Sequence, residues 1–245
     1  MRPLELLAPA KNLETGIAAI EHGADAIYIG AEQLGARSAA GNSVEDIAQL
    51  CQYAKQFGVK VYVTLNVIVY EHEIDYCQKL ITQLYEAGVD ALIVQDMGVL
   101  KMDIPPIELH ASTQTDNRTA DKVSWLKSLG FARVVLAREL SLDAIKAIHK
   151  EEPDVELEVF VHGALCVSYS GVCYVSQHSF GRSANRGECA QFCRMSFDLV
   201  DSDDREIEHQ RHLLSLKDMC RINELEQLAD AGATSFKIEG RLKDV

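Results

Sequence analysis

Residues 84–96 read LYEAGVDALIVQD, and this phrase indicates the fold. It joins the end of a helical pattern to Gly88 and then to a run that is almost wholly apolar. Glycine suits the C-terminal end of a helix because it tolerates positive φ. The apolar run is typical of a strand that is buried on both faces of a parallel sheet. The phrase therefore predicts one helix-to-strand step of an α/β fold.

The same phrase recurs four more times, with Gly23, Gly58, Gly130 and Gly232 at the turn. Eight such units in 245 residues fit an α/β fold of the (β/α)8 TIM-type barrel class better than a doubly wound sheet. We expect one barrel domain over residues 1–245. With three further apolar runs, the pattern predicts eight strands at about 4–8, 26–30, 60–66, 91–95, 107–112, 133–137, 156–162 and 235–239.

Two irregularities interrupt the repeat. The seventh predicted strand is followed by about 70 residues, far more than an ordinary connection. We interpret residues 163–215 as a Cys-rich segment inserted between strands seven and eight. The eighth strand ends close to the end of the sequence, so we expect a barrel that lacks its last helix. Because an uncovered parallel strand exposes apolar surface, we also expect a homo-oligomer that covers this edge of the barrel.

Charge and composition limit the partners. The net charge of −13 argues against broad non-specific binding to nucleic acid, which needs clustered Lys and Arg. Residues 177–194 invert this balance locally with Arg182, Arg186 and Arg194, so this stretch could face an anion. The N-terminus has no signal-peptide pattern, and no apolar run approaches the length of a membrane helix. We expect a cytoplasmic protein that does not bind membranes.

Four cysteines, Cys166, Cys173, Cys189 and Cys193, lie within 28 residues. Such density in a reducing compartment predicts one site at which four thiolates converge on a metal. Their spacing is not the paired C-x-x-C of zinc ribbons. Four thiolates hold either structural zinc or an iron–sulfur cluster, and the spacing alone leaves both open. Cys51 and Cys77 fall within helical patterns, where free cysteines act as small buried hydrophobes.

Barrel enzymes carry their chemistry at the C-terminal ends of the strands. Reading those ends, we predict three catalytic residues, His162, His110 and Glu239. The alternatives are a rim ion pair for Glu239 and a purely structural role for His110. The same positions predict a set of substrate-binding residues that suits a small anion: Asn66, Gln95, Gln114, Arg138, Lys237 and Arg241.

The sequence also resembles a known family. The pattern E-x-F-x-x-G-A-L-C-x₆-C-x-x-S runs from Glu158 to Ser176 and is similar to the signature of the collagenase-like proteases. That group is peptidase family 32 of unknown catalytic type. LELLAPAKN at 4–12, ELHASTQT at 108–115 and FKIEGR at 236–241 resemble it too, so the resemblance covers essentially the whole chain.

Within the family, the chain most resembles members that modify RNA. The resemblance implies iron–sulfur and prephenate dependent hydroxylation of a cytidine to 5-hydroxycytidine in ribosomal RNA or its precursor. It implies a 4Fe–4S cluster with zinc as the alternative metal, prephenate (a small dicarboxylate) as co-substrate, and the loss of the family's C-terminal domains. The implied cluster ligands are Cys166, Cys173, Cys189 and Cys193, with Cys220 as a rival for the last position.

Two other functions stay open at this point. One is a collagenase-like peptidase, in which His162 would activate the Cys166 thiol. The sequence contains no H-E-x-x-H and no G-x-S-x-G to support proteolysis by another route. The other is a zinc-stapled barrel without enzymatic activity.

Overall fold

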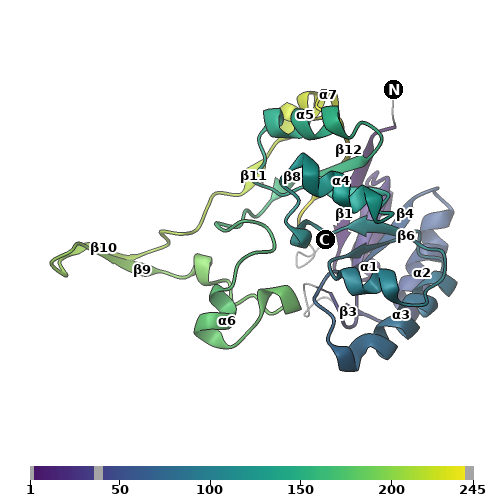
Figure 1. The fold of residues 1–245 in the computed structure, drawn as a ribbon, viewed down its shortest axis with the longest axis horizontal. Helices are drawn as coiled ribbons and strands as arrows, with labels where there is room; N and C mark the ends of the chain where they lie inside the picture. Colours follow the sequence, from purple (N-terminus) through teal and green to yellow (C-terminus); the bar gives the residue numbers. More distant parts are fainter. Residues whose placement is uncertain (1–2, 36–40, 241–245) are drawn as a thin grey trace.

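The computed structural model describes residues 3–35 and 41–240. Within them, parallel strands form a closed barrel, because β1 pairs with β2 on one side and with β12 on the other (Figure 1). This confirms the predicted (β/α)8 TIM-type class. Around the barrel the strands are β1 (Glu5–Ala10), β2 (Ala26–Ala31), β4 (Lys60–Leu65), β5 (Ala91–Val94), β6 (Glu108–Ala111), β7 (Arg133–Val135), β8 (Glu156–Gly163) and β12 (Ala233–Ile238).

The repeated phrase has the predicted local structure. All five of its glycines have positive φ, from +71° at Gly58 to +101° at Gly232, and each precedes a barrel strand. Between β5 and β6 a short 3₁₀ helix, Met97–Lys101, takes the place of an α-helix. The helices that pack on the outside of the barrel are α1 (Leu13–Glu21), α2 (Val44–Lys55), α3 (Ile74–Glu86), α4 (Ala120–Ser128), α5 (Leu142–Glu151) and α7 (Leu225–Asp230).

The barrel interior is apolar toward the C-terminal ends of the strands and charged toward their N-terminal ends. An apolar cluster that includes Tyr28, Ile93 and Phe160 fills the end toward the C-termini of the strands. Beneath it, Arg133 contacts the carboxylates of Glu5 and Glu158, and both cation and anions are largely buried. Burial opposes the charge of Arg133, but the Glu158 and Glu5 carboxylates more than offset this and raise its pKa. A buried charge of this kind is stable only when it is paired.

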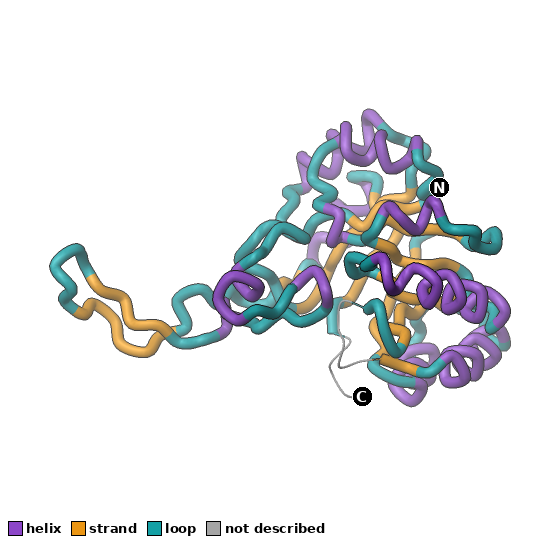
Figure 2. The backbone as a smooth tube through the Cα atoms, turned by 60° about the horizontal axis from the view of Figure 1, so that its bottom comes forward, coloured by secondary structure: helices purple, strands orange, loops and turns teal. Residues whose placement is uncertain are grey.

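Residues 164–232 separate β8 from β12 and contain the predicted Cys-rich segment. They include helix α6 (Val175–Phe180) and a two-stranded antiparallel hairpin, β9 (Phe197–Val200) and β10 (Glu206–Arg211). This hairpin, which we call the arm, extends away from the barrel (Figures 1 and 2). Two more short strands, β3 (Gly41–Asn42) and β11 (Met219–Cys220), lie beside β2 and β8. We did not predict the arm or these short strands.

An apolar groove lies on the outside of the barrel beside β12 and β1. Its volume is about 1210 Å³. Side chains from β12, α7 and the residue before β1 line it, among them Phe236, Leu225 and Leu4. The apolar outer face of β12, which we expected to be uncovered, therefore lines this groove in the described residues.

Candidate active site

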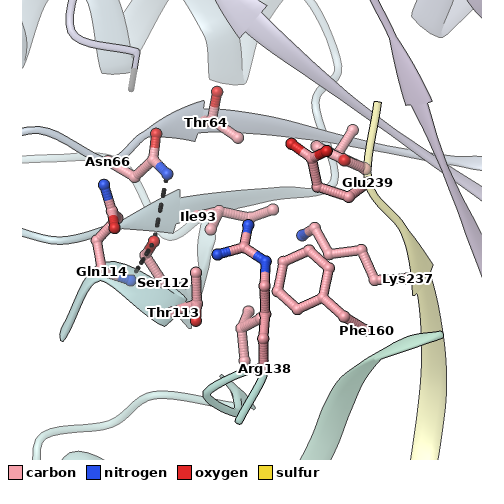
Figure 3. A pocket seen from close by; sticks show the side chains of 12 residues that line it. Thr64, Asn66, Ile93, Ser112, Thr113, Gln114, Arg138, Phe160, Lys237 and Glu239 are labelled. Carbon is pink, nitrogen blue, oxygen red and sulfur yellow. Dashed lines mark hydrogen bonds between the residues drawn. The ribbon is translucent and has the colours of Figure 1, made fainter. Parts of the chain in front are cut away.

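A small polar cavity opens at the C-terminal ends of the barrel strands. Its volume is about 70 Å³, which is room for a few water molecules. Figure 3 shows Arg138, in the loop after β7, reaching toward Lys237 on β12 and Glu239 directly after it. Asn66 Nδ2 donates to Ser112 Oγ at 3.2 Å, and this hydroxyl also accepts from the backbone N–H of Gln114. The cavity thus brings together five predicted site residues: Asn66, Gln114, Arg138, Lys237 and Glu239.

Lys237 is fixed from below by Glu158. Its ammonium lies 2.6 Å from Glu158 Oε1 and 4.1 Å from the centre of the Tyr28 ring, and the Glu158 side chain is fully buried. The second oxygen of Glu158 contacts Arg133 at 3.3 Å. One carboxylate therefore links the cavity to the charged lower layer of the barrel. Sequence reasoning did not select Glu158 as a site residue, although it belongs to the signature pattern quoted above.

His110 and Gln95 do not line the cavity. The His110 side chain is fully buried inside the barrel, bonded to Glu108 at 2.8 Å and packed edge-on against Tyr62. This position fits the structural alternative better than the catalytic prediction. Gln95 instead donates from Nε2 to the Gln114 carbonyl and to Asn185 Oδ1, both at 3.3 Å. It joins the rim of the barrel to the Cys-rich segment.

His162 faces the outer groove and not the cavity. Phe160 pairs with Lys237, but the next pair is His162 with Ile238, so β8 carries an irregularity between these positions. A bulge of this kind re-aims the side chain that follows it. His162 lines the groove together with Ile238 and Cys220, and Cys220 is its partner residue on β11. Arg241 lies outside the described residues.

Further contacts hold the Cys-rich segment against the barrel mouth. Gly171, with φ of +81°, lies so close to the Gln114 backbone that a Cβ atom would meet its carbonyl oxygen at 2.1 Å. Ser170 donates from both its N–H and its hydroxyl to the Glu139 carboxylate at 3.1 Å. Arg186 pairs with Glu73, and although burial favours the protonated acid, this bond lowers the pKa of Glu73.

Two of the three arginines that were predicted to face an anion form bonds within the protein. Arg186 is bound to Glu73 and to the Ile68 carbonyl. Arg194 donates to the carbonyls of Leu165 and Leu216 and ties the two ends of the Cys-rich segment together. Arg182 has an exposed side chain. Of the three, Arg182 is the one that extends from this segment toward solvent.

The stretch between Cys166 and Cys173 packs on the mouth of the barrel through Ser170 and Gly171. Burial raises the pKa of Cys166, while a hydrogen bond from the Ser168 backbone lowers it; the Cys193 and Cys173 thiols raise it further and Arg138 opposes them. Cys189 accepts hydrogen bonds from the N–H of Gln191 at 3.4 Å and from Ser176 Oγ at 4.0 Å. Four thiols in one segment, of which Cys189 is hydrogen-bonded to the protein, fit the ligands of a thiolate-bound metal centre.

The spacing of these thiols is wider than a single tetrahedral zinc ion requires. Zn–S bonds of about 2.3 Å put the sulfur atoms roughly 4 Å apart. Within residues 3–35 and 41–240, one group of three potential ligand atoms lies within 4.8 Å of one another. It belongs to Asp198, Glu206 and His209 of the exposed arm and includes no cysteine. Cys220, the rival ligand, lies on the outer groove beside His162.

Cys51 and Cys77 are buried in α2 and α3, as predicted. Burial raises the pKa of Cys51 to about 12 and that of Cys77 to about 11. Both thiols are therefore protonated at neutral pH and suit packing rather than ligation.

Known proteins share this closed (β/α)8 barrel and its Cys-rich segment. The chain belongs to peptidase family U32, whose model matches residues 11–245. This confirms the resemblance stated from the signature pattern.

Three relatives differ in what their names describe. The chain is 55% identical over 242 residues to the 23S rRNA 5-hydroxycytidine C2501 synthase of Escherichia coli, covering 99% of this chain and 37% of that protein. It is 39% identical to the tRNA hydroxylation protein P1 of Bacillus subtilis, covering 98% and 59%. It is 36% identical to a collagenase of Porphyromonas gingivalis, covering 98% and 61%. The chain therefore spans well under two thirds of each relative.

Among solved structures, the U32 peptidase Mk0906 has the same fold. The TM-score is 0.60 at 12% sequence identity, over 98% of this chain and 94% of that one. In the described part of the chain, every helix falls short of the length and apolar character that crossing a membrane requires.

Proposed function

We propose that this chain is the catalytic core of an RNA hydroxylase, and that it acts on a cytidine of ribosomal RNA or its precursor in the cytoplasm. One observation carries the proposal: the stretch between Cys166 and Cys173 packs, through Ser170 and Gly171, beside a cavity that presents Arg138, Lys237 and two amides. The 55% identity to a ribosomal RNA hydroxycytidine synthase supports the reaction and the substrate.

The cofactor is a 4Fe–4S cluster held by Cys166, Cys173, Cys189 and Cys193. Such a cluster supplies one-electron chemistry when it is bound. Cys193 is preferred to Cys220 as the fourth ligand, because Cys220 lines the outer groove beside His162.

The co-substrate is prephenate, a small dicarboxylate. Arg138 and Lys237 attract its carboxylates, Asn66 and Gln114 orient it by hydrogen bonds, and Glu239 can accept a proton at the same place. The cavity of about 70 Å³ is too small to enclose such a molecule. The ligand must therefore extend out of the mouth, or the overlying Cys-rich segment must move when it binds.

Metal and sulfide analysis of protein prepared without oxygen tests this proposal. We expect about four irons and four sulfides per chain. Cys166→Ala and Cys173→Ala should lose them, whereas Cys51→Ala and Cys77→Ala should retain them. Stoichiometric zinc without sulfide would contradict the cluster and favour a zinc-stapled barrel. Protein that retains its cluster would then be assayed for hydroxylation of ribosomal RNA with and without prephenate.

The name of the collagenase relative suggests peptidase activity as a second candidate function, but the geometry gives this function little support. A cysteine peptidase needs a base beside its thiol. His162 was the predicted base for Cys166, and the bulge in β8 turns it into the outer groove.

A further inference from the structure

Exposed aromatic rings are concentrated near the cysteines. Tyr169 and Tyr174 are 57% and 59% exposed, and Phe180, at the end of α6, is also exposed. All three lie within a stretch of twelve residues. Single exposed aromatic residues are ordinary on a protein surface, but three within one short stretch of sequence indicate a surface that binds a ligand.

The first part of the Cys-rich segment differs from the rest of the chain in charge. Residues 163–196 contain three arginines, one glutamate, no lysine and no aspartate, which gives a net charge of +2. The other residues of the chain therefore carry −15, since the whole chain has −13. Arg186 and Arg194 of this stretch are bound within the protein, so Arg182 is the arginine that it offers to a polyanion.

Arginines accompany two of the exposed rings at the mouth. The Arg118 guanidinium lies 4.0 Å from the centre of the Tyr169 ring and is also bound to Asp116. Arg186 lies 4.5 Å from the centre of the Tyr70 ring, in the loop that follows β4. Aromatic rings interleaved with arginines are typical of surfaces that bind single-stranded nucleic acid.

Tyr169 is also placed beside the cavity. Its neighbour Ser170 is bound to Glu139 after β7, and Gly171 packs on the backbone of Gln114, which lines the cavity. A base stacked on Tyr169 would therefore lie at the edge of the mouth.

We propose that Tyr169, Tyr174, Phe180 and Arg182 form a stacking surface for unpaired nucleotides of RNA. It holds the nucleotides around the target so that the target base reaches the barrel mouth. This inference rests on the proposed function, which supplies RNA as the substrate, and adds the surface and the strandedness of that RNA. Unpaired bases offer the π-faces that aromatic side chains stack against, whereas paired bases in a duplex do not.

The arm does not share this role. Residues 197–211 contain six acidic residues and two arginines, so their net charge is −4. Phosphate groups would be repelled there. We therefore place the RNA along α6 and the mouth, and away from β9 and β10.

Fluorescence anisotropy with a labelled, unstructured oligoribonucleotide tests the proposal on the full chain. We expect Tyr169→Ala to weaken binding by about 5- to 150-fold, which corresponds to the loss of one stacked base. Tyr169→Phe should bind like the unchanged protein, because it keeps the ring. Arg182→Ala should reduce the slope of log K against log salt by about 0.7, as expected for one phosphate contact.

Tyr85→Ala is the matched control, since Tyr85 is an exposed tyrosine on α3 outside the proposed surface. Equal binding by Tyr169→Ala and the unchanged protein would overturn the inference. So would absence of RNA binding, tighter binding of a duplex of the same sequence, or tighter binding of an acidic peptide than of RNA.

These outcomes are separable from failure of the proposed function. Iron and sulfide content is measured on the same Tyr169 variants, and we expect it to be unchanged. If RNA does not stack on this surface but the cluster is intact, the binding surface alone is refuted. A chain that stacks RNA but holds no cluster would refute the hydroxylase proposal and leave the binding surface standing.

Discussion

At the scale of single residues, Glu158 is shared between two buried cations. One oxygen binds the Lys237 ammonium, and the other contacts Arg133. Removing this charge would leave both cations with less compensation in a site closed to water. We predict that Glu158→Gln lowers the free energy of unfolding by about 3–5 kcal/mol, as measured by urea denaturation.

Glu156→Gln is the control for this change. Glu156 also binds Arg133, at 2.8 Å, but its side chain is 49% exposed. An exposed ion pair contributes little, so the expected cost is below about 1 kcal/mol. Equal costs for the two variants would show that the buried position of Glu158 is not what matters.

The two histidines show what strand-end reasoning can and cannot predict. Side chains on a strand alternate between faces, so the residues that follow a strand can be assigned to the mouth from sequence. This was sufficient for Asn66, Gln114, Arg138, Lys237 and Glu239. It failed for His162 because an irregular pairing in β8 changes the alternation, and nothing in the sequence marks that irregularity. It failed for His110 because the residue lies deeper in the barrel than its place near a strand end suggested.

At the scale of elements, Arg186 connects the Cys-rich segment to the loop after β4. It pairs with Glu73 and donates to the Ile68 carbonyl, while the adjacent Asn185 accepts from the Ile68 N–H at 3.1 Å. We predict that Arg186→Ala lowers the free energy of local opening of residues 66–73 and 183–188 by about 1–3 kcal/mol. Hydrogen exchange read by mass spectrometry measures this.

Arg205→Ala, on the exposed arm, serves as the comparison and should leave exchange in both stretches unchanged. Global stability should also stay the same in Arg186→Ala, because the barrel keeps its own contacts. Protection that is identical in the two variants would mean that the segment is held by other contacts, such as the packing of Gly171.

Elements with a repeated pattern were predictable, and those without one were not. Each barrel strand follows a glycine turn or forms an apolar run, and the observed bounds lie within a few residues of the predicted ones. The arm has neither feature. Strands β9 and β10 are largely exposed on both faces, so their sequence lacks the alternation that burial of one face imposes.

At the scale of the whole molecule, the apolar groove beside β12 and β1 is the main exposed feature. Our expectation that a second copy of the chain covers it predicts reversible, concentration-dependent self-association. Ile222 lines the groove and is 68% exposed. Ile222→Asp should therefore shift the equilibrium toward the monomer in sedimentation velocity without unfolding the chain.

A charge at an exposed position away from the groove, as in Leu199→Asp on the arm, should leave that equilibrium unchanged. A chain that sediments as a monomer at all concentrations would refute this expectation. Association that Leu199→Asp weakens and Ile222→Asp does not would place the contact on the arm.

The projecting arm also affects how the molecule scatters and diffuses. A compact barrel with a thin extension has a larger maximum dimension than a sphere of equal mass, while most of its mass stays near the centre (Figure 2). Small-angle X-ray scattering should therefore give a pair-distance distribution with one main peak and a long, shallow tail. Because the arm forms contacts mostly within itself, replacing residues 197–211 with a short glycine–serine link should remove the tail and leave the peak in place.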